Sequence, residues 1–404
     1  MKIPFSLPLI DKDVIDEVND ALLNTGWLTS GPKVLELEQE FKNLTGCQFT
    51  VCVNSWSSGA MLMLRWFGVG PGDEVIIPAY TYSGTALAAL NIGAKPVMVD
   101  VGEDFNIDPG KIRAAITSKT KAIIPVDIAG LPCDYDKIFE IIESDVVKSL
   151  FVSNHRNQGK LGRILVLSDA AHSIGATYKG VDIGRVCDAT VFSLHSVKNI
   201  TTGEGGAICI NLPEQFNPKD EYKFLKAFSL NGQTKSAFEK NQPGAWRYDI
   251  IDQGLKVNLP DLNAAVGLAQ IRKYTSELLP ERKRIVELYD EVFSKYNWAI
   301  LPTHKDSFRQ SSCHLYLLRI RDFSEEQRDR LITSVSNMGV GVNVHYIPMA
   351  MLTLFKSLGY SINNYPSCYS LYANEITLPV YNGLTKEQVN YVVDSVVESY
   401  NNLA

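Results

Sequence analysis

The chain has 404 residues, of which 45% are hydrophobic and 21% charged, and its formal net charge is −6 at neutral pH. This length exceeds that of an ordinary single-core domain, so we expect two domains or one large domain with a lobe. The moderate negative charge argues against nucleic acid as a main partner, and no run of about 18 apolar residues predicts a membrane span.

The seven cysteines have no regular spacing, which is typical of free thiols in a reducing compartment. No Cys-x-x-Cys or His-x-x-x-His pair indicates a structural metal. The first eight residues, M-K-I-P-F-S-L-P, lack the long apolar core of a signal peptide. We therefore expect a cytoplasmic protein without a bound metal.

In chain order, residues 11–23 and 34–44 each carry apolar side chains at helical spacing, and the G-W-L-T-S-G-P stretch at 26–32 separates them. Seven apolar runs then predict strands, with helical stretches between most of them. They are Phe49–Asn54, Glu74–Pro78, Lys95–Val101, Lys121–Ile128, Arg163–Asp169, Ala189–Leu194 and Gly206–Ile210. This alternation predicts a mostly parallel sheet with helices on both faces.

Two polar stretches interrupt the pattern. Residues Ser153–Arg163 favour a solvated surface loop, although His155 or Arg156 in it could instead face a substrate. Residues 212–260 form the longest stretch without a clear strand, and long loops that are not of low complexity tend to be functional.

The C-terminal part begins after a predicted helix at 262–273 and a second one from Pro280 to about Lys295. Strands are expected at Cys313–Ile320, Gly341–Tyr346 and Glu375–Pro379. The stretches S-E-E-Q at 324–327 and T-K-E-Q at 385–388 fit the capping box, in which Ser or Thr is followed three residues later by Gln, so each predicts a helix start.

One lysine, Lys198, lies between two predicted core strands, in the sequence S-L-H-S-V-K-N-I-T-T-G-E-G-G-A-I at 193–208. Burial lowers the pKa of a lysine toward the free amine that forms Schiff bases with carbonyl groups. The glycines would let the backbone pass close to a bulky group. The alternative is an ordinary surface lysine in a hairpin loop.

A carboxylate matches this lysine. The stretch L-V-L-S-D-A-A-H-S-I-G at 165–175 is an apolar strand that ends in Asp169. Enzymes that use pyridoxal phosphate (PLP) need a lysine for the aldehyde and a carboxylate that keeps the pyridine nitrogen protonated. Asp169 and Lys198 each lie at the C-terminal end of a predicted strand, so we expect them to meet at the carboxyl edge of the sheet, where open α/β sheets bind ligands.

These motifs resemble the sugar aminotransferases of the DegT/DnrJ/EryC1/StrS family, within the fold-type-I PLP enzymes. The resemblance rests on D-A-A-H-S, on S-x-H-x-x-K-x-x-x-T-G-E-G-G-A, on G-W-L-T-S-G-P, on P-A-Y-T-Y at 78–82 and on H-Y-I-P at 345–348. It implies a seven-stranded, mostly parallel α/β sheet flanked by helices, and a smaller α+β C-terminal domain. The large PLP-binding domain would span residues 1–275 and the small domain residues 276–404.

The resemblance also implies a phosphate site. In N-S-W-S-S-G at 54–59, where a strand becomes a helix, the Ser57 hydroxyl and the Ser58 backbone N–H would hold the PLP phosphate, since helix N-termini bind anions. Ser193 matches a second phosphate-binding hydroxyl. Trp56 is a departure, because the family pattern has glycine there.

Other residues are implied for the ring and the substrate. Tyr82 matches the aromatic side chain that stacks on the ring, although alone it would suggest a core tyrosine. His172 matches the residue beside the phenolic oxygen. The expected substrate residues are Trp27, His195, His345 and Tyr346. Trp27 could instead pack in a helix-ending turn, and His195 could be a satisfied core histidine.

Asn258 matches an asparagine that reaches the cofactor phosphate from the partner subunit, which implies a homodimer with shared active sites. Some relatives carry arginine two residues later, where this chain has Pro260. The alternative for Asn258 is a helix cap before Pro260.

The implied function is a PLP-dependent aminotransferase that moves an amino group from L-glutamate to a nucleotide-linked keto-sugar. A 4-keto-6-deoxy hexose in surface polysaccharide or glycoside synthesis is the favoured acceptor. Lys198 would move the proton and Asp169 would hold the ring nitrogen charged. The alternatives are amination of a cyclitol or aminobenzoate precursor, sugar dehydration, for which the sister enzymes carry histidine at the lysine position, and a PLP-binding regulator without turnover.

Overall fold

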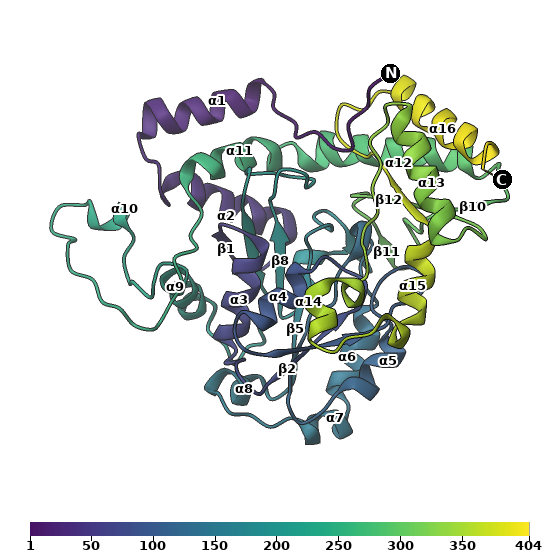
Figure 1. The fold of residues 1–404 in the computed structure, drawn as a ribbon. Helices are drawn as coiled ribbons and strands as arrows, with labels where there is room; N and C mark the ends of the chain where they lie inside the picture. The colour runs from purple at the N-terminus through teal and green to yellow at the C-terminus, as the bar shows by residue number, and fades with distance from the viewer. Residues whose placement is uncertain (404) are drawn as a thin grey trace.

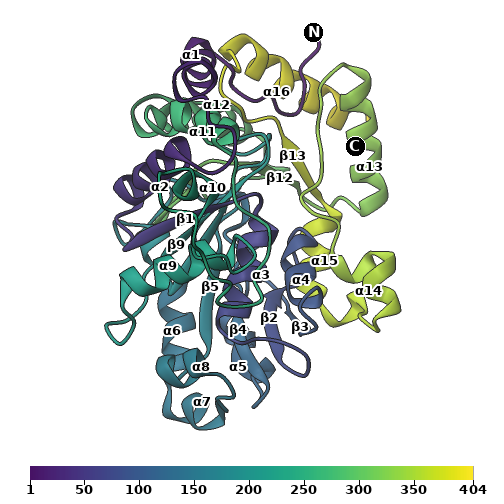
Figure 2. The same cartoon turned by 90° about the vertical axis from the view of Figure 1, so that its left-hand side faces the viewer.

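The computed structural model describes residues 1–403. A large sheet lies between two layers of helices, and a smaller C-terminal unit lies at one end, with both chain termini on it (Figures 1 and 2). Along these residues we find no helix whose length and hydrophobicity would allow it to cross a membrane.

The large sheet contains all seven strands that the sequence predicts, so this prediction is confirmed. They are β1 (Phe49–Val53), β2 (Glu74–Pro78), β3 (Lys95–Val99), β4 (Thr120–Ile123), β5 (Leu165–Asp169), β8 (Ala189–Ser193) and β9 (Gly206–Ile210). Their order in space is β1-β9-β8-β5-β4-β2-β3. Only β9 runs against its neighbours, β1 and β8, while the pairs from β8 to β3 are parallel.

The strands bury both of their faces, as strands in parallel sheets do. In β2, Val75 and Ile77 belong to one hydrophobic core and Ile76 to the other, because alternate side chains point to opposite faces. The first core also contains α3 (Trp56–Trp66), α4 (Gly84–Leu90) and α9 (Pro218–Phe228). The second contains α2 (Pro32–Thr45), α5 (Pro109–Ala115), α6 (Tyr135–Glu143), α7 (Asp145–Leu150) and α11 (Asp261–Ile271).

The polar stretch at 153–163 is not the loop that we expected, because it contains the helix α8 (Arg156–Leu161). Two of its polar side chains are buried and bond to the end of α3. The Asn157 amide donates to the Trp66 carbonyl at 2.7 Å, and the Gln158 amide donates to the Gly68 carbonyl at 3.3 Å. These buried amides replace the apolar face that a helix prediction requires.

The C-terminal unit has a third core and a sheet of three strands, β10 (Ala299–Ile300), β12 (Tyr316–Ile320) and β13 (Glu375–Leu378). Its helices are α12 (Leu279–Phe293), α13 (Glu325–Asn337), α14 (Thr353–Ser357), α15 (Pro366–Ala373) and α16 (Lys386–Asn401). Both predicted capping boxes are present, at the starts of α13 and α16. Ile3 packs in this core too, and the division of the chain at 275/276 stays a prediction.

The predicted strand Gly341–Tyr346 is wrong. Asn343 alone pairs with β13, since its N–H and carbonyl bond to Thr377. The next ladder position is lost because the His345 N–H donates to the side chain of Glu375, at 3.2 Å from Oε2, rather than to a backbone carbonyl.

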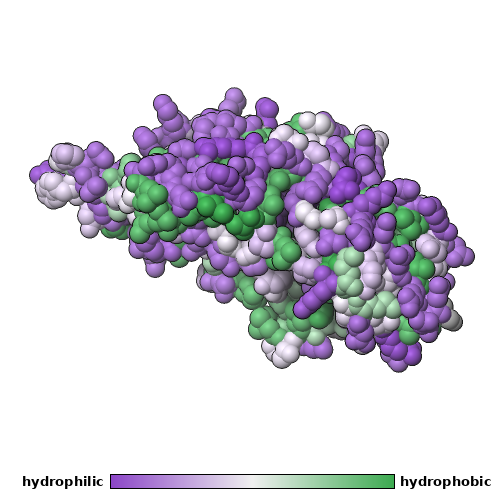
Figure 3. All heavy atoms as spheres, turned by 90° about the horizontal axis from the view of Figure 1, so that it is seen from above, coloured by the Kyte–Doolittle hydropathy of each residue, from purple (hydrophilic) through white to green (hydrophobic). Residues whose placement is uncertain are grey.

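The smaller elements complete the fold. They are α1 (Lys12–Asp20), α10 (Ala237–Lys240), β6 (Thr177–Tyr178), β7 (Val181–Asp182), β11 (Arg309–Gln310) and the short η1 (Ala21–Thr25), η2 (Ile128–Gly130), η3 (Ile183–Arg185), η4 (Tyr274–Leu278), η5 (Met349–Met351) and η6 (Ile362–Asn364). The segment around α10 projects from the body (Figure 1), and it reaches outward at the left of the view from above (Figure 3).

Candidate active site

A cavity of about 470 Å³ lies at the carboxyl ends of β5 and β8, against the C-terminal unit. It is lined by nine of the residues that the sequence singled out, namely Ser57, Tyr82, Asp169, His172, Ser193, His195, Lys198, His345 and Tyr346. The fold thus brings together the lysine and the carboxylate on which the PLP interpretation depends.

Lys198 follows β8 in a turn, with its N–H bonded to the His195 carbonyl at 2.9 Å. Its burial lowers the pKa of the ammonium group to about 8, and the charge of Asp169 opposes this shift. A lysine with this pKa has an appreciable fraction of free amine near neutral pH. The placement excludes an ordinary surface lysine.

Asp169 is the last residue of β5 and is buried. The Thr85 hydroxyl donates to Oδ2 at 2.8 Å, and the Ala171 N–H donates to Oδ1 at 3.2 Å. Burial raises the pKa of this carboxyl to about 7, although both hydrogen bonds and Lys198 lower it. A cationic ring nitrogen placed against Asp169 would restore its charge. We did not predict Thr85, which belongs to α4 and gives no motif.

His172 is held in one tautomer. Its Nδ1 accepts the Ala129 N–H at 3.3 Å, so the ring proton is on Nε2 and donates to the Tyr346 hydroxyl at 3.0 Å. Burial and then Lys198 lower the pKa of His172 well below its usual range, so the ring is neutral.

A second buried histidine, His314, packs against His172 with ring centroids 4.3 Å apart and the ring planes tilted by 33°. The amide nitrogen of Asn199 donates to two oxygens, so its Oδ1 accepts the Nδ1–H of His314 at 2.7 Å. Burial, followed by His172 and Lys198, lowers the pKa of His314 well below its usual range. The Nε2 of His314 is therefore an acceptor, on a residue that lines the cavity.

Tyr82 is 63% exposed, which excludes a core tyrosine. Its ring lies 5.9 Å from that of Tyr346, at an angle of 47°. The ring therefore offers an apolar face at the cavity wall, as stacking on a flat ligand requires.

The N-terminus of α3 forms another wall, with Ser55, Trp56 and Ser57 lining the cavity. Ser58 does not line it, and its N–H, which was expected to hold the phosphate, donates instead to the capping Ser55 hydroxyl at 3.1 Å. Within residues 1–403, the buried indole Nε1–H of Trp56 has no acceptor. Free donors at a helix N-terminus suit an anion.

Besides Ser58, two further predicted residues, Trp27 and Asn258, do not line the cavity. The Trp27 indole donates to the Ser30 carbonyl at 3.0 Å, and its ring meets Phe238 edge-on. The Asn258 amide donates to the Ser30 hydroxyl at 2.7 Å, so Ser30 contacts both residues. Asn258 does not cap α11, whose N-cap is Pro260, which excludes the alternative that we considered.

The N-terminal segment supplies two further lining residues, Phe5 and Ser6, which we did not predict. Ile3 anchors this segment, since its N–H donates to the Gly339 carbonyl at 2.9 Å and its carbonyl accepts the Gly341 N–H at 2.8 Å. Nothing in a short N-terminal stretch indicates a partner more than 300 residues away.

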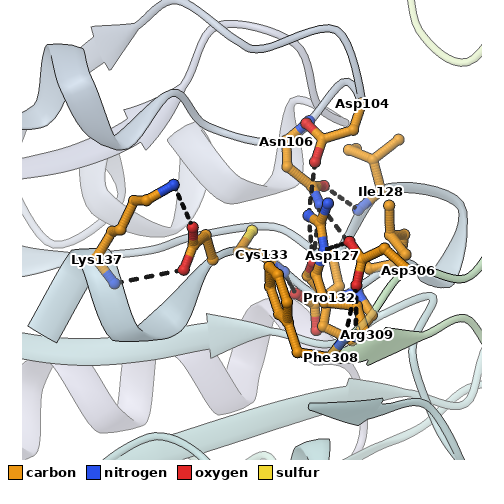
Figure 4. A network of polar contacts seen from close by, with 12 residues as sticks. Asp104, Asn106, Asp127, Ile128, Pro132, Cys133, Lys137, Asp306, Phe308 and Arg309 are labelled. Atoms are coloured by element: carbon orange, nitrogen blue, oxygen red, sulfur yellow. Dashed lines mark hydrogen bonds and ion pairs between the residues drawn. The ribbon is translucent and has the colours of Figure 1, made fainter. Parts of the chain in front are cut away.

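A polar network surrounds η2 and the residues that follow it (Figure 4). Arg309 donates to Asp104 at 2.6 Å, to Asp306 at 2.7 Å and to the Pro132 carbonyl at 3.2 Å. Two residues after Asp104, the side-chain oxygen of Asn106 accepts the Ile128 N–H at 3.0 Å. The network thus ties the C-terminal unit to η2, which contains the Ala129 that orients His172.

The residues of this cavity fit PLP. Its volume is in the range of cofactor sites. Lys198 would bind the aldehyde and Asp169 the ring nitrogen, and Tyr82 offers a stacking face. At the start of α3, Ser55 and Ser57 line the cavity, and the buried indole N–H of Trp56 has no acceptor among residues 1–403. When bound, the cofactor supplies the electron sink for proton removal next to nitrogen.

Comparison with known proteins agrees with this geometry. Residues 8–397 match the DegT/DnrJ/EryC1/StrS aminotransferase family. The spore coat polysaccharide biosynthesis protein SpsC of Bacillus subtilis is 35% identical over 399 residues, which cover 98% of this chain and 96% of SpsC. The structure superposes on the pyridoxamine phosphate form of Spr1654 from Streptococcus pneumoniae, assigned as a sugar aminotransferase, with a TM-score of 0.95, 41% identity and full coverage of both chains.

A PLP form of Spr1654 is similar, with a TM-score of 0.94 and 40% identity over both whole chains. PseC of Helicobacter pylori, an aminotransferase of pseudoaminic acid biosynthesis, matches with a TM-score of 0.84 and 26% identity over both whole chains. With the paired Lys198 and Asp169 in one cavity, this chain belongs to the DegT/DnrJ/EryC1/StrS aminotransferase family and is a PLP-dependent aminotransferase.

Proposed function

We propose that the protein is a sugar aminotransferase that takes the amino group of L-glutamate and delivers it to a nucleotide-linked keto-sugar, with a 4-keto-6-deoxy hexose as the favoured acceptor. The pairing of Lys198 and Asp169 in one cavity carries the proposal for the chemistry. The relatives in polysaccharide and pseudoaminic acid synthesis support a sugar acceptor.

Lys198 is the base and acid of the reaction. With the cofactor bound, its amine takes the proton from the donor's α-carbon and later returns a proton during transfer to the acceptor. Its lowered pKa lets the free amine and the ammonium form interconvert near neutral pH. The Asp169 carboxylate holds the ring nitrogen protonated, and Thr85 and the Ala171 N–H keep this carboxylate oriented.

The other cavity residues would bind and orient the cofactor and the substrate. The hydroxyls of Ser57 and Ser193, on residues that line the cavity, would hold the phosphate, and Tyr82 would cover the ring. His172, which is neutral and hydrogen bonded to Tyr346, would bind the ring's phenolic oxygen. His195, His345 and Tyr346 face the substrate.

We propose further that the protein is a homodimer with shared sites. Asn258 lies outside its own subunit's cavity, and Trp27 is its neighbour through Ser30. A second subunit that brings these residues to the cavity mouth would complete the phosphate and substrate sites. The projecting segment carries exposed apolar side chains, including Trp246 at 69% exposure, which suit a contact with a partner.

The experiment for the chemistry uses Lys198→Ala. Wild-type protein should hold PLP through a linkage that borohydride reduction makes permanent, and Lys198→Ala should bind PLP only reversibly. A reducible linkage in Lys198→Ala would show that another lysine is used. For the acceptor, the pyridoxamine phosphate form is assayed against a panel of nucleotide keto-sugars, and turnover with none of them would reject the proposed substrate class.

A further inference from the structure

A buried carboxylate, Glu375, lies behind the cavity wall on β13 and is fully buried, as is Thr377 on the same face of the strand. No cation forms an ion pair with Glu375 within residues 1–403; the guanidinium of Arg328 donates instead to its backbone carbonyl, at 3.0 Å. Burying a carboxylate without a countercharge is costly, which makes its hydrogen-bond partners informative.

These partners form a chain to the cavity. Glu375 Oε2 accepts the N–H of His345, and its Oε1 is hydrogen bonded to the Thr377 hydroxyl. The Thr377 oxygen lies 3.1 Å from Nδ1 of His345, a residue that lines the cavity. The Phe5 ring stacks on this imidazole at 5.3 Å and 21°, so the ring is also held from the face.

The hydrogen bonds from Glu375 through Thr377 to His345 allow two arrangements of protons. With Glu375 ionised, the Thr377 hydroxyl donates to the carboxylate and accepts the Nδ1–H of His345, which leaves Nε2 as an acceptor. With Glu375 protonated, the acid donates to Thr377, whose hydroxyl then donates to Nδ1, so Nε2 carries the proton. Because the Thr377 hydroxyl has one proton to donate, the protonation state of Glu375 determines which ring nitrogen of His345 is protonated.

We propose that Glu375, acting through Thr377, sets which ring nitrogen of His345 carries the proton, and so whether a substrate meets a donor or an acceptor at that point. Glu375 and Thr377 are then positioning residues for substrate recognition, which deepens the proposed function and rests on it for the role of His345. An acceptor at Nε2 selects a substrate hydroxyl, and a donor selects a carbonyl or phosphate oxygen.

The surroundings place the change in an accessible pH range. Burial raises the pKa of the Glu375 carboxyl to about 8, against its hydrogen bonds to Thr377 and His345 and the charge of Arg328. Tyr80, from the loop after β2, also faces this carboxylate. Burial, and after it the charge of Glu375, raises the pKa of the Tyr80 phenol. Burial and then Lys198 lower the pKa of His345 to about 3, so its ring stays neutral.

The experiment is ¹⁵N NMR of histidine-labelled holoenzyme, in which protonated and unprotonated ring nitrogens have different shifts. His345→Gln identifies the signals of His345, and His314, whose Nδ1–H is fixed by Asn199, is the internal reference. Glu375→Gln places an amide donor toward Thr377 and should keep the proton on Nε2 at all pH values studied. Wild type should carry it on Nε2 at about pH 6.5 and on Nδ1 at about pH 9.5.

The proposal is overturned if wild type and Glu375→Gln carry the proton on the same nitrogen at the higher pH. Should Glu375→Gln fail to fold, Thr377 gives the test: Thr377→Val should abolish the pH dependence of the tautomer, and Thr377→Ser should retain it. A pH dependence that survives in Thr377→Val equally overturns the proposal. In the keto-sugar assay, a variant that puts the wrong protonation state at His345 Nε2 loses one hydrogen bond to the substrate, so its kcat/KM should differ from that of wild type by about tenfold.

The NMR result does not need turnover, so it separates this proposal from the proposed function. If the His345 tautomer depends on Glu375 but the protein has no activity on keto-sugars, the tautomer proposal stands and the proposed substrate class is rejected. If the protein is active on keto-sugars but the tautomer does not depend on Glu375, the substrate class stands and the tautomer proposal is rejected.

Discussion

Two side chains of opposite charge, Lys198 and Asp169, face one cavity and shift each other's titration. Burial removes both from water, which pushes the pKa of the lysine down to about 8 and that of the aspartate up to about 7. Asp169 is therefore close to half-ionised near neutral pH, and Lys198 has an appreciable fraction of free amine. Both conditions suit proton transfer and are rare for surface residues.

The first prediction concerns Asp169→Asn. The amide keeps the size and one acceptor for Thr85, so the protein should fold and bind PLP. It cannot hold the ring nitrogen protonated by charge, so kcat should fall roughly 10²- to 10⁴-fold. Steady-state rates with saturating donor measure this. Thr85→Val is the matched control, because it leaves the carboxylate of Asp169 in place and removes one of its hydrogen bonds. Near-normal turnover in Asp169→Asn would contradict the role that we give Asp169.

The second prediction is a pH dependence of PLP attachment to the apoprotein. The free amine of Lys198 attacks the aldehyde, and its fraction grows as pH rises through the lowered pKa of about 8. At pH 7 about a tenth of Lys198 is unprotonated, and the rate should rise up to about tenfold between pH 7 and 9 and then level off. Stopped-flow absorbance measures the rate; a rise that continues unchanged to pH 10 would indicate the usual lysine pKa of 10.5.

At the scale of elements, the sheet could be predicted because its strands are apolar runs with their own local signal. Lys198 and Asp169 could be predicted for the same reason, since each lies at the C-terminal end of such a strand. Thr85, His314 and Phe5 could not, because each reaches the cavity only through long-range packing. The helix α8 was missed because its buried face consists of amides, whose partners lie at the end of α3.

The third prediction tests the network at η2 and β11. Arg309→Met removes the charge of a side chain that is 12% exposed and leaves Asp104 and Asp306 without their partner, so the free energy of unfolding should fall by about 1–3 kcal/mol. The matched control is Arg330→Met. The Arg330 side chain is 58% exposed and its guanidinium lies 3.8 Å from Glu326, so the free energy of unfolding should change by less than about 0.5 kcal/mol. Urea unfolding compares the two, and equal effects would contradict a structural role for the network.

At the scale of the whole molecule, one subunit leaves Asn258 and Trp27 outside the cavity they were expected to serve. The fourth prediction therefore mixes Lys198→Ala with Asn258→Ala. In a dimer with shared sites, one site of the mixed dimer carries both lesions and the other neither. Activity should recover toward half that of wild type per mixed dimer.

This prediction requires that Asn258→Ala alone is severely impaired. Losing one charge-assisted contact to a phosphate costs about 1–3 kcal/mol, and PLP affinity should fall up to roughly a hundredfold without unfolding. Absence of recovery after proven subunit exchange would mean that Asn258 does not serve a neighbouring site.

The reversed strand β9 has a consequence for synthesis on the ribosome. In the sheet, β1 has β9 as its one neighbour, although β9 follows it by about 150 residues, an interval of roughly 8–30 s of translation. All five residues of β1 are buried in the finished fold, so the nascent chain holds an apolar strand without a partner throughout that interval. Chaperone occupancy of β1 on stalled nascent chains should end once residue 210 leaves the exit tunnel, because β9 can then pair with β1 and join it to β8.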